Sequence, residues 1–407
     1  MQRIPWTMPD TPVWLQGRSI IQRIQEAGYR AVFVGGCIRD QLMGDAVADI
    51  DIASDAPSPI IEDLFPHTVA VGKAFGVIIV VDQGRHFEVA QFRHDGPSLD
   101  SRHPQSIRPG SEAEDVLRRD FTFNALIGDP QQGEIRDHVQ GLQDLQQRRL
   151  RLVGDAKTRL GEDHLRILRA ARFAARFTCT LCPDTAQALC EVACEGVSKE
   201  RVWSECDKVF GQAWQGRWID FLVQWGHWRV IGPSDVLPHE VLGIVLQWWE
   251  HPLARDPMVA EIVLWHACIH YNLITDNSFS RWYADQPVTR ERKKSISRAL
   301  SILPQVSEDL PEVPQRQRLV RETIAPQVAA CLQVIGARSA HAFAQSLKEE
   351  QERGPIPQLL SAQELITLGI ARGPQLGVAL RGIEDAWLSG RISDTQQARA
   401  WVHNHYL

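Results

Sequence analysis

Two aspartates, Asp49 and Asp51, stand two residues apart in the stretch Ala48–Ala53, where carboxylates alternate with apolar residues. This alternation is typical of a β-strand, on which both carboxylates would leave the same face. Oxygen ligands at this spacing suit Mg²⁺, which also binds triphosphate oxygens, and two such ions can activate a hydroxyl and stabilise leaving pyrophosphate. A solvated acidic strand is the alternative. Glu88, in the strand-like His86–Phe92, is the candidate third carboxylate, with an ordinary exposed glutamate as the alternative.

A turn suited to phosphate binding comes just before these aspartates. Gly35 and Gly36 follow the short apolar strand expected at Ala31–Val34, and a helix is expected to run on through Met43. Paired glycines allow a sharp turn and close approach of a ligand, and the first N–H groups of the helix can bind phosphate. Arg39, one turn into that helix, can add a charge-assisted hydrogen bond.

A second motif is the nine-residue string from Arg118 to Leu126. Arg119, Asp120 and Asn124 combine a phosphate donor, an acceptor and an amide that both donates and accepts. Such a set can hold a triphosphate and a ribose together. A helix start capped by Asp120 is the alternative interpretation.

A third motif begins at Asp163 and Arg166 and continues with Arg169, Arg172 and Arg176. At about 100° per residue the four arginines share one helical face, with Asp163 beside Arg166. A carboxylate acceptor next to a guanidinium donor matches the amine and ring nitrogen of cytosine and adenine, but not uracil or guanine. A bidentate contact of this kind discriminates by about 1–3 kcal/mol. A solvated arginine face is the alternative.

Together these strings resemble the class II tRNA nucleotidyltransferases and bacterial poly(A) polymerases of the polymerase β-type superfamily. The family patterns GGxxRD, DxD, RRDFTxNA and EDxxR occur here in that order between Val34 and Arg176, and further similar stretches lie at Glu200–Val202 and Leu368–Gly377. The sequence departs from the common DxDxxT at Ser54. The resemblance implies template-independent addition of C, C and A to the 3′ end of tRNA from CTP and ATP, with release of pyrophosphate and Mg²⁺ as cofactor.

The resemblance also implies a role for each matching residue. The metal ligands would be Asp49 and Asp51. The nucleotide-binding residues would be Gly35, Gly36, Arg39 and Arg119 at the triphosphate, Asp120 and Asn124 at the sugar, Asp163 and Arg166 at the base, and Arg169 and Arg172 lining the same pocket. A flexible element linked to switching from C to A addition would carry Arg93, Asp95, Asp100 and Arg102, with Ser101 where a glycine is common.

The elements that must position these residues change character along the chain. Strand-like stretches, among them Gly76–Val81, alternate with helices up to about Leu142, with a long loop expected at Gly96–Gly110; helices separated by proline-bearing turns follow. With the resemblance, this predicts an α+β head, built on a small, mixed, twisted sheet, followed by an all-α neck, body and tail. The expected divisions are the catalytic head at 1–142, the neck with the base-selecting helix at 143–232, the body at 233–335 and the tRNA-binding tail at 336–407.

Composition limits the remaining possibilities. The 407 residues contain 44% hydrophobic and 23% charged residues, which is typical of a globular protein. The net charge is −6, yet residues 147–176 carry nine basic and three acidic side chains, a local patch suited to RNA. No apolar run approaches the roughly 20 residues of a membrane span, the N-terminus lacks a signal-peptide pattern, and eight cysteines do not form a disulfide framework. We therefore expect a cytoplasmic protein without a membrane partner.

Three alternatives stay open. A poly(A) polymerase, or an enzyme that adds only the terminal A, would share the same catalytic residues. A catalytically inactive RNA-binding protein would keep the basic patch, but the presence of both Asp49 and Asp51 argues against it. The oligomeric state is not determined by the sequence.

Overall fold

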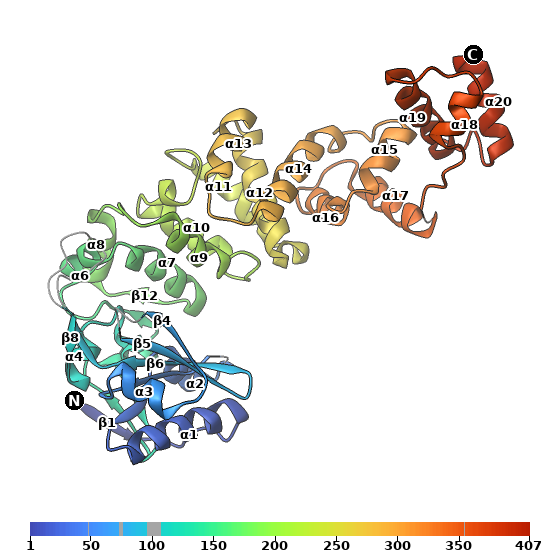
Figure 1. Cartoon of the computed structure of the whole chain (residues 1–407). Coiled ribbons are helices and arrows are strands. Elements are labelled where there is room, and N and C mark those ends of the chain that lie inside the picture. Colours follow the sequence, from blue (N-terminus) through green and yellow to red (C-terminus); the bar gives the residue numbers. More distant parts are fainter. Residues whose placement is uncertain (48, 73–75, 96–106, 354) are drawn as a thin grey trace. The chain divides into compact units, whose positions relative to one another are not determined.

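A computed structural model describes residues 1–47, 49–72, 76–95, 107–353 and 355–407 (Figure 1). The chain forms two compact units. Unit 1 contains Met1–Cys206 and Arg217–Gly232, and unit 2 contains Asp207–Gly216 and Pro233–Leu407. The division into head, neck, body and tail is finer than these two units and stays a prediction.

An eight-stranded mixed sheet forms the centre of unit 1, with the order β1-β10-β9-β2-β3-β6-β5-β4. The pairs along this order are antiparallel except for β3 and β6, which run parallel. The predicted α+β head and helical remainder are confirmed. The strands of the sheet are β1 (Gln2–Pro5), β2 (Ala31–Val34), β3 (Asp51–Ser54), β4 (Thr68–Gly72), β5 (Val77–Asp82), β6 (Arg85–Gln91), β9 (Ile127–Asp129) and β10 (Glu134–Asp137).

Apolar side chains cover both faces of the sheet. On one face, α1 and α3 contribute residues such as Ile21 and Ile61 to a core that includes Phe33 and Phe87. On the other face, a smaller cluster contains Val116 of α4. The helices of this region are α1 (Pro12–Glu26), α2 (Gly36–Met43), α3 (Ser58–Leu64), α4 (Glu112–Leu117), the 3₁₀ turn η2 (Thr122–Asn124) and α5 (Gly141–Gln146).

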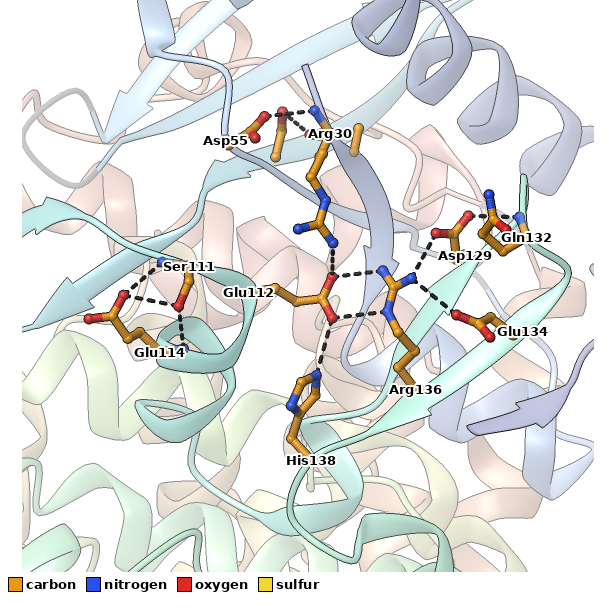
Figure 2. Close-up of polar contacts among 12 residues, drawn as sticks. Arg30, Asp55, Ser111, Glu112, Glu114, Asp129, Gln132, Glu134, Arg136 and His138 are labelled. Carbon is orange, nitrogen blue, oxygen red and sulfur yellow. Dashed lines mark hydrogen bonds and ion pairs between the residues drawn. The ribbon is translucent and has the colours of Figure 1, made fainter. Parts of the chain in front are cut away.

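The buried carboxylate of Glu112, at the start of α4, lies at the centre of a polar network (Figure 2). Arg136 donates to it through Nε at 2.9 Å and Nη2 at 2.7 Å, Arg30 donates at 3.0 Å, and His138 Nε2 lies 3.1 Å away. Arg136 also donates to Asp129 at 2.9 Å. This network ties α4 to β10 and therefore fixes the helix that precedes Arg119.

Two small sheets lie where the sequence predicted none. β7 (Arg93–Asp95) pairs with β8 (Ile107–Pro109), so part of the loop expected at Gly96–Gly110 is a strand. β11 (Arg149–Leu150) pairs in parallel with β12 (Thr180–Leu181), so the expectation that strands end near Leu142 was wrong. A strand of two or three residues is too short to show a period-two pattern.

The remaining helices of unit 1 follow the sheet in sequence. The expected helix around the third motif is broken in two, because the chain is extended at Asp163 (φ −153°, ψ 101°) between α6 and α7. These elements are α6 (Ala156–Glu162), α7 (Leu165–Phe177), α8 (Pro183–Glu191), α9 (Lys199–Asp207), α10 (Gln215–Gln224) and the 3₁₀ turn η3 (Trp228–Val230), of which α9 and α10 cross the unit boundary by one and two residues.

Unit 2 is helical. Its buried Glu261 accepts hydrogen bonds from Trp265, Tyr283 and Arg292 at 2.7–3.1 Å. Within the described ranges no helix is long and apolar enough to cross a membrane. The elements are α11 (His239–Trp249), η4 (Pro252–Arg255), α12 (Pro257–His270), α13 (Asp276–Ala284), α14 (Arg290–Val306), α15 (Val313–Val320), α16 (Ala325–Val334), α17 (Ala340–Arg353), α18 (Ala362–Thr367), α19 (Pro374–Leu388) and α20 (Thr395–Tyr406).

Candidate active site

Asp51 opens β3 and lies directly opposite Glu88 in the parallel strand β6. Register partners on neighbouring strands project to the same face, so the two carboxylates share a face. Burial raises the pKa of Asp51 to about 6, and the charge of Glu88 and then of Asp49 adds to the rise, while Arg119 and Arg39 oppose it. The structure therefore gathers negative charge around Asp51, which a bound cation would neutralise.

Asp49 does not lie in the strand predicted for it. β3 begins at Asp51, and Asp49 is an exposed residue of the segment before it. The prediction that one strand holds both aspartates was therefore wrong. Asp49 still precedes Asp51 by two residues, and its charge contributes to the raised pKa of Asp51.

Gly35 forms the turn between β2 and α2. Its φ of 77° favours glycine, and a Cβ there would lie 3.0 Å from Nη1 of Arg119 and 3.9 Å from Oδ2 of Asp51. The turn therefore brings backbone close to both side chains. α2 then begins at Gly36 and ends at Met43, as predicted.

The side chains of Arg39, Asn124 and Asp120 form a hydrogen-bonded row. Nη1 of the buried Arg39 donates to Oδ1 of Asn124, and Nδ2 of Asn124 donates to Oδ1 of Asp120 at 3.1 Å. Asp120 also accepts from the N–H of Phe121 at 2.7 Å. The glycine turn and the second motif, more than 80 residues apart, therefore meet in one site.

Arg169 of α7 extends this row. Its Nε and Nη2 atoms lie 2.7 and 2.6 Å from Oδ2 of Asp120. Burial acts to raise the pKa of Asp120, but the charge of Arg169 and hydrogen bonds from Asn124, Arg169 and Phe121 lower it to about 2. Asp120 is therefore a charged acceptor at neutral pH.

Asp163 and Arg166 are placed differently from the single helix that the sequence predicted. Asp163 lies at the break after α6, and its two oxygens accept from Arg201 at 3.0 and 2.8 Å. Arg166, in α7, donates to Glu162 at 3.0 Å and to the carbonyl oxygen of Arg118 at 3.3 Å. Each side chain is therefore held by protein partners, and their joint contact with a base stays a prediction.

The sequence analysis did not identify two buried carboxylates that hold arginines of the predicted site. Asp115 of α4 accepts from Arg119 at 3.1 Å, and Glu205 of α9 accepts from Arg172 at 2.5 Å. The spacing of Asp115 and Arg119, i and i+4, was a usable signal. Arg172 and Glu205 are 33 residues apart, so no local spacing indicated their contact.

The segment expected to be flexible is described in part. The backbone N–H of Arg93 donates to Asp115 at 3.4 Å, and Arg93 and Asp95 belong to β7. The side chain of Asp95, and Asp100 and Arg102 as whole residues, lie outside the described residues.

The donor set around Asp51 suits a divalent cation, since it consists of carboxylates whose like charges raise a pKa. Among the residues that the structure describes, no three His, Cys, Asp or Glu side chains are arranged to hold a metal ion. The assignment of Asp49 and Asp51 as metal ligands, with Glu88 as a third ligand, therefore stays a prediction.

Known proteins resemble this chain in sequence and in fold. Residues 31–151 match the poly A polymerase head domain. The chain is 38% identical to the CCA-adding enzyme of Geobacillus stearothermophilus over an alignment that spans about half of each chain (53% of this chain and 54% of the relative). It is 30% identical to the CCA-adding enzyme of Leuconostoc citreum over 94% of this chain and 93% of the relative.

The crystal structure of the Bacillus stearothermophilus CCA-adding enzyme in complex with CTP superposes with a TM-score of 0.82, at 26% identity, over 97% of this chain and 98% of that one. The chain therefore belongs to the family of CCA-adding enzymes and is a nucleotidyltransferase.

Proposed function

We propose that this protein adds C, C and A to the 3′ end of tRNA, using CTP and ATP and releasing pyrophosphate. Family membership over nearly the whole chain supports this reaction. The observation that carries the proposal is the position of Asp51, which faces Glu88 across the β3–β6 pair while the Gly35 turn and Arg119 lie beside it. A negatively charged cluster next to arginines and a glycine turn is the arrangement that a metal-bound triphosphate needs.

Asp49 and Asp51 are proposed to hold Mg²⁺. When bound there, the ions would supply Lewis-acid activation of the tRNA 3′-hydroxyl and stabilisation of the leaving pyrophosphate. The protein's own contribution is to keep Asp51 partly buried against Glu88, so that its charge favours a cation.

The nucleotide would lie along the hydrogen-bonded row. Gly35, Gly36, Arg39 and Arg119 are proposed to bind the triphosphate, because backbone N–H groups and guanidinium groups suit phosphate oxygens. Asp120 and Asn124 are proposed to orient the sugar. The ionised Asp120 fixes the amide of Asn124 by accepting one of its two N–H groups, and the second N–H can donate to a ribose oxygen.

Base selection is proposed for Asp163 and Arg166, with Arg169 and Arg172 lining the pocket. Oδ1 of Asp163 accepts from Arg201 and from the N–H of Leu165, whereas Oδ2 accepts from Arg201 and keeps a lone pair, which can accept from the exocyclic amine of cytosine or adenine. We also infer that Arg93, Asp95, Asp100 and Arg102 belong to an element that adjusts the pocket between C and A, and that the reaction takes place in the cytoplasm.

Primer extension tests the reaction. tRNAs that lack one, two or three terminal nucleotides are incubated with CTP alone, ATP alone or both. The proposal expects C to be added twice and A once, after which extension stops. Unlimited A addition to any RNA would instead show a poly(A) polymerase, which the match to a poly A polymerase head domain makes the relevant second candidate. Extension confined to the last A would show an A-only enzyme.

Two sets of variants test the assigned roles. Asp49→Ala is expected to abolish transfer while tRNA binding, measured by filter binding, is retained; loss of binding without loss of transfer would refute the division of roles. Asp163→Ala or Arg166→Ala is expected to raise incorporation of U and G. Unchanged base selectivity in both variants would refute base selection by this pair.

A further inference from the structure

Four phenylalanines pack together where the second motif meets α7. The rings of Phe173 and Phe177 are stacked, with centroids 5.9 Å apart and an interplanar angle of 7°. Phe121 and Phe123 approach Phe173 edge-on, at 5.5 and 5.8 Å. Phe173 is 3% exposed, so its position is set by this packing.

Three guanidinium groups lie over the ring of Phe173. The Cζ atoms of Arg172, Arg39 and Arg169 are 4.2, 5.1 and 5.4 Å from its centroid. The negative face of an aromatic ring attracts a cation at such distances, and more strongly where water is excluded. Arg39 is 5% exposed and burial lowers its pKa, so the ring face replaces part of its lost hydration.

These arginines are assigned to different parts of the proposed nucleotide site. Arg39 is assigned to the triphosphate, whereas Arg169 and Arg172 line the base pocket. We propose that Phe173 is a positioning residue: its ring holds Arg39, which binds the triphosphate, and Arg169 and Arg172, which line the base pocket, in fixed relative positions. Base selection would therefore depend on Phe173. This inference rests on the proposed function. It assigns a role to Phe173, a side chain to which the proposed function gives no contact with metal or substrate.

Phe177 provides a matched comparison. It is stacked on Phe173 and lies under Arg39 at 4.9 Å and Arg176 at 4.6 Å. The carboxylate partners of Arg176 are Asp40 and Asp45, close to the glycine turn. Phe177 therefore shares the triphosphate-side contact of Phe173 but not its contacts with Arg169 and Arg172.

The test compares Phe173→Leu with Phe177→Leu, both of which keep an apolar side chain of somewhat smaller volume and remove the ring face. Transfer of each of the four nucleotides to shortened tRNA is measured at varied concentration. Both variants are expected to raise KM for CTP and ATP about tenfold through Arg39. Phe173→Leu alone is expected to raise U and G incorporation relative to C and A, also about tenfold. Phe173→Tyr, which keeps the ring face, is expected to restore the wild-type selectivity.

Several outcomes decide the inference. If Phe173→Leu and Phe177→Leu have equal base selectivity, or if both only lower kcat and the unfolding temperature, Phe173 is a packing residue and the inference is overturned. Should Phe173→Leu fail to fold, Phe173→Met replaces it with the same expectation. If the wild-type protein transfers neither C nor A, the proposed function fails instead, which the wild-type control shows separately.

Discussion

Glu112 and Asp51 belong to the same unit and have opposite surroundings. The Glu112 carboxylate accepts from Arg30 and Arg136 and contacts His138, all within 3.1 Å (Figure 2). Asp51 instead faces Glu88, and burial and like charges raise its pKa to about 6. A carboxylate whose charge is matched by several donors stabilises a fold, whereas a buried one placed beside further carboxylates, which Arg119 and Arg39 offset only in part, suits a ligand that brings positive charge.

The largest expected effect concerns activity. Asp51→Asn removes a proposed metal ligand and should lower nucleotide transfer by about 10³-fold or more, because metal-ion catalysis supplies several kcal/mol. The unfolding temperature should not fall, since the substitution relieves repulsion with Glu88 and Asp49. Single-turnover transfer and thermal unfolding measure the two quantities. Transfer within tenfold of wild type would contradict the assignment.

The opposite result is expected at Glu112. Glu112→Ala leaves the buried Arg136 without its main carboxylate partner, which should cost about 3–5 kcal/mol of unfolding free energy. Denaturant titration measures it. The control is Glu114→Ala, in the same helix. The half-buried Glu114 completes the capping box with Ser111 and pairs with the exposed Arg108, so its loss should have a smaller effect. If the two variants lose equal unfolding free energy, the buried hydrogen bonds of Glu112 stabilise the fold no more than the capping bonds of Glu114 do.

The second unit offers another fully paired carboxylate. Glu261→Gln keeps the shape but removes the charge to which Arg292 donates at 2.8 Å and weakens the bond from Tyr283. We expect a loss of about 1–3 kcal/mol of unfolding free energy, measured by denaturant titration. Glu240→Gln, on the exposed surface of α11, is the control. An unchanged unfolding free energy in Glu261→Gln would show that the charge of this buried carboxylate does not stabilise the second unit.

The smallest effect concerns pH. Because the folded-state pKa of Asp51 is raised from 3.8 to about 6, its ionised form costs stability above pH 6, and that cost disappears as the pH falls through 6 towards 3.8. Without divalent ions, Asp51→Asn should therefore be more stable than wild type at pH 7–8 by about 1–2 kcal/mol. The difference should shrink below pH 5. Added Mg²⁺ should stabilise wild type and not the variant; a difference independent of both pH and Mg²⁺ would contradict the role of Asp51.

Local patterns predicted much of the first unit. β2 and α2 have the predicted ends, since an apolar run and a glycine turn depend on neighbouring residues. The start of β3 was misplaced by three residues, and Asp163 was placed on a helix that is in fact broken there. At Asp51 the strand begins where the backbone pairs with Glu88 of β6, and the side chain of Asp163, at the helix break, is bonded to Arg201. A local sequence pattern contains neither of these distant partners.

The sequence by itself determined the kind of chemistry. Carboxylates, glycines and arginines at fixed short spacings restrict which ligands they can bind, and these spacings survive in any fold that keeps the local elements. Tertiary structure alone decided that Glu88 faces Asp51, that Glu205 holds Arg172, and that Arg39, from a distant segment, lies over the ring of Phe173. Such pairings depend on strand register and on the packing of side chains between elements, and neither is encoded in the period of a short stretch of sequence.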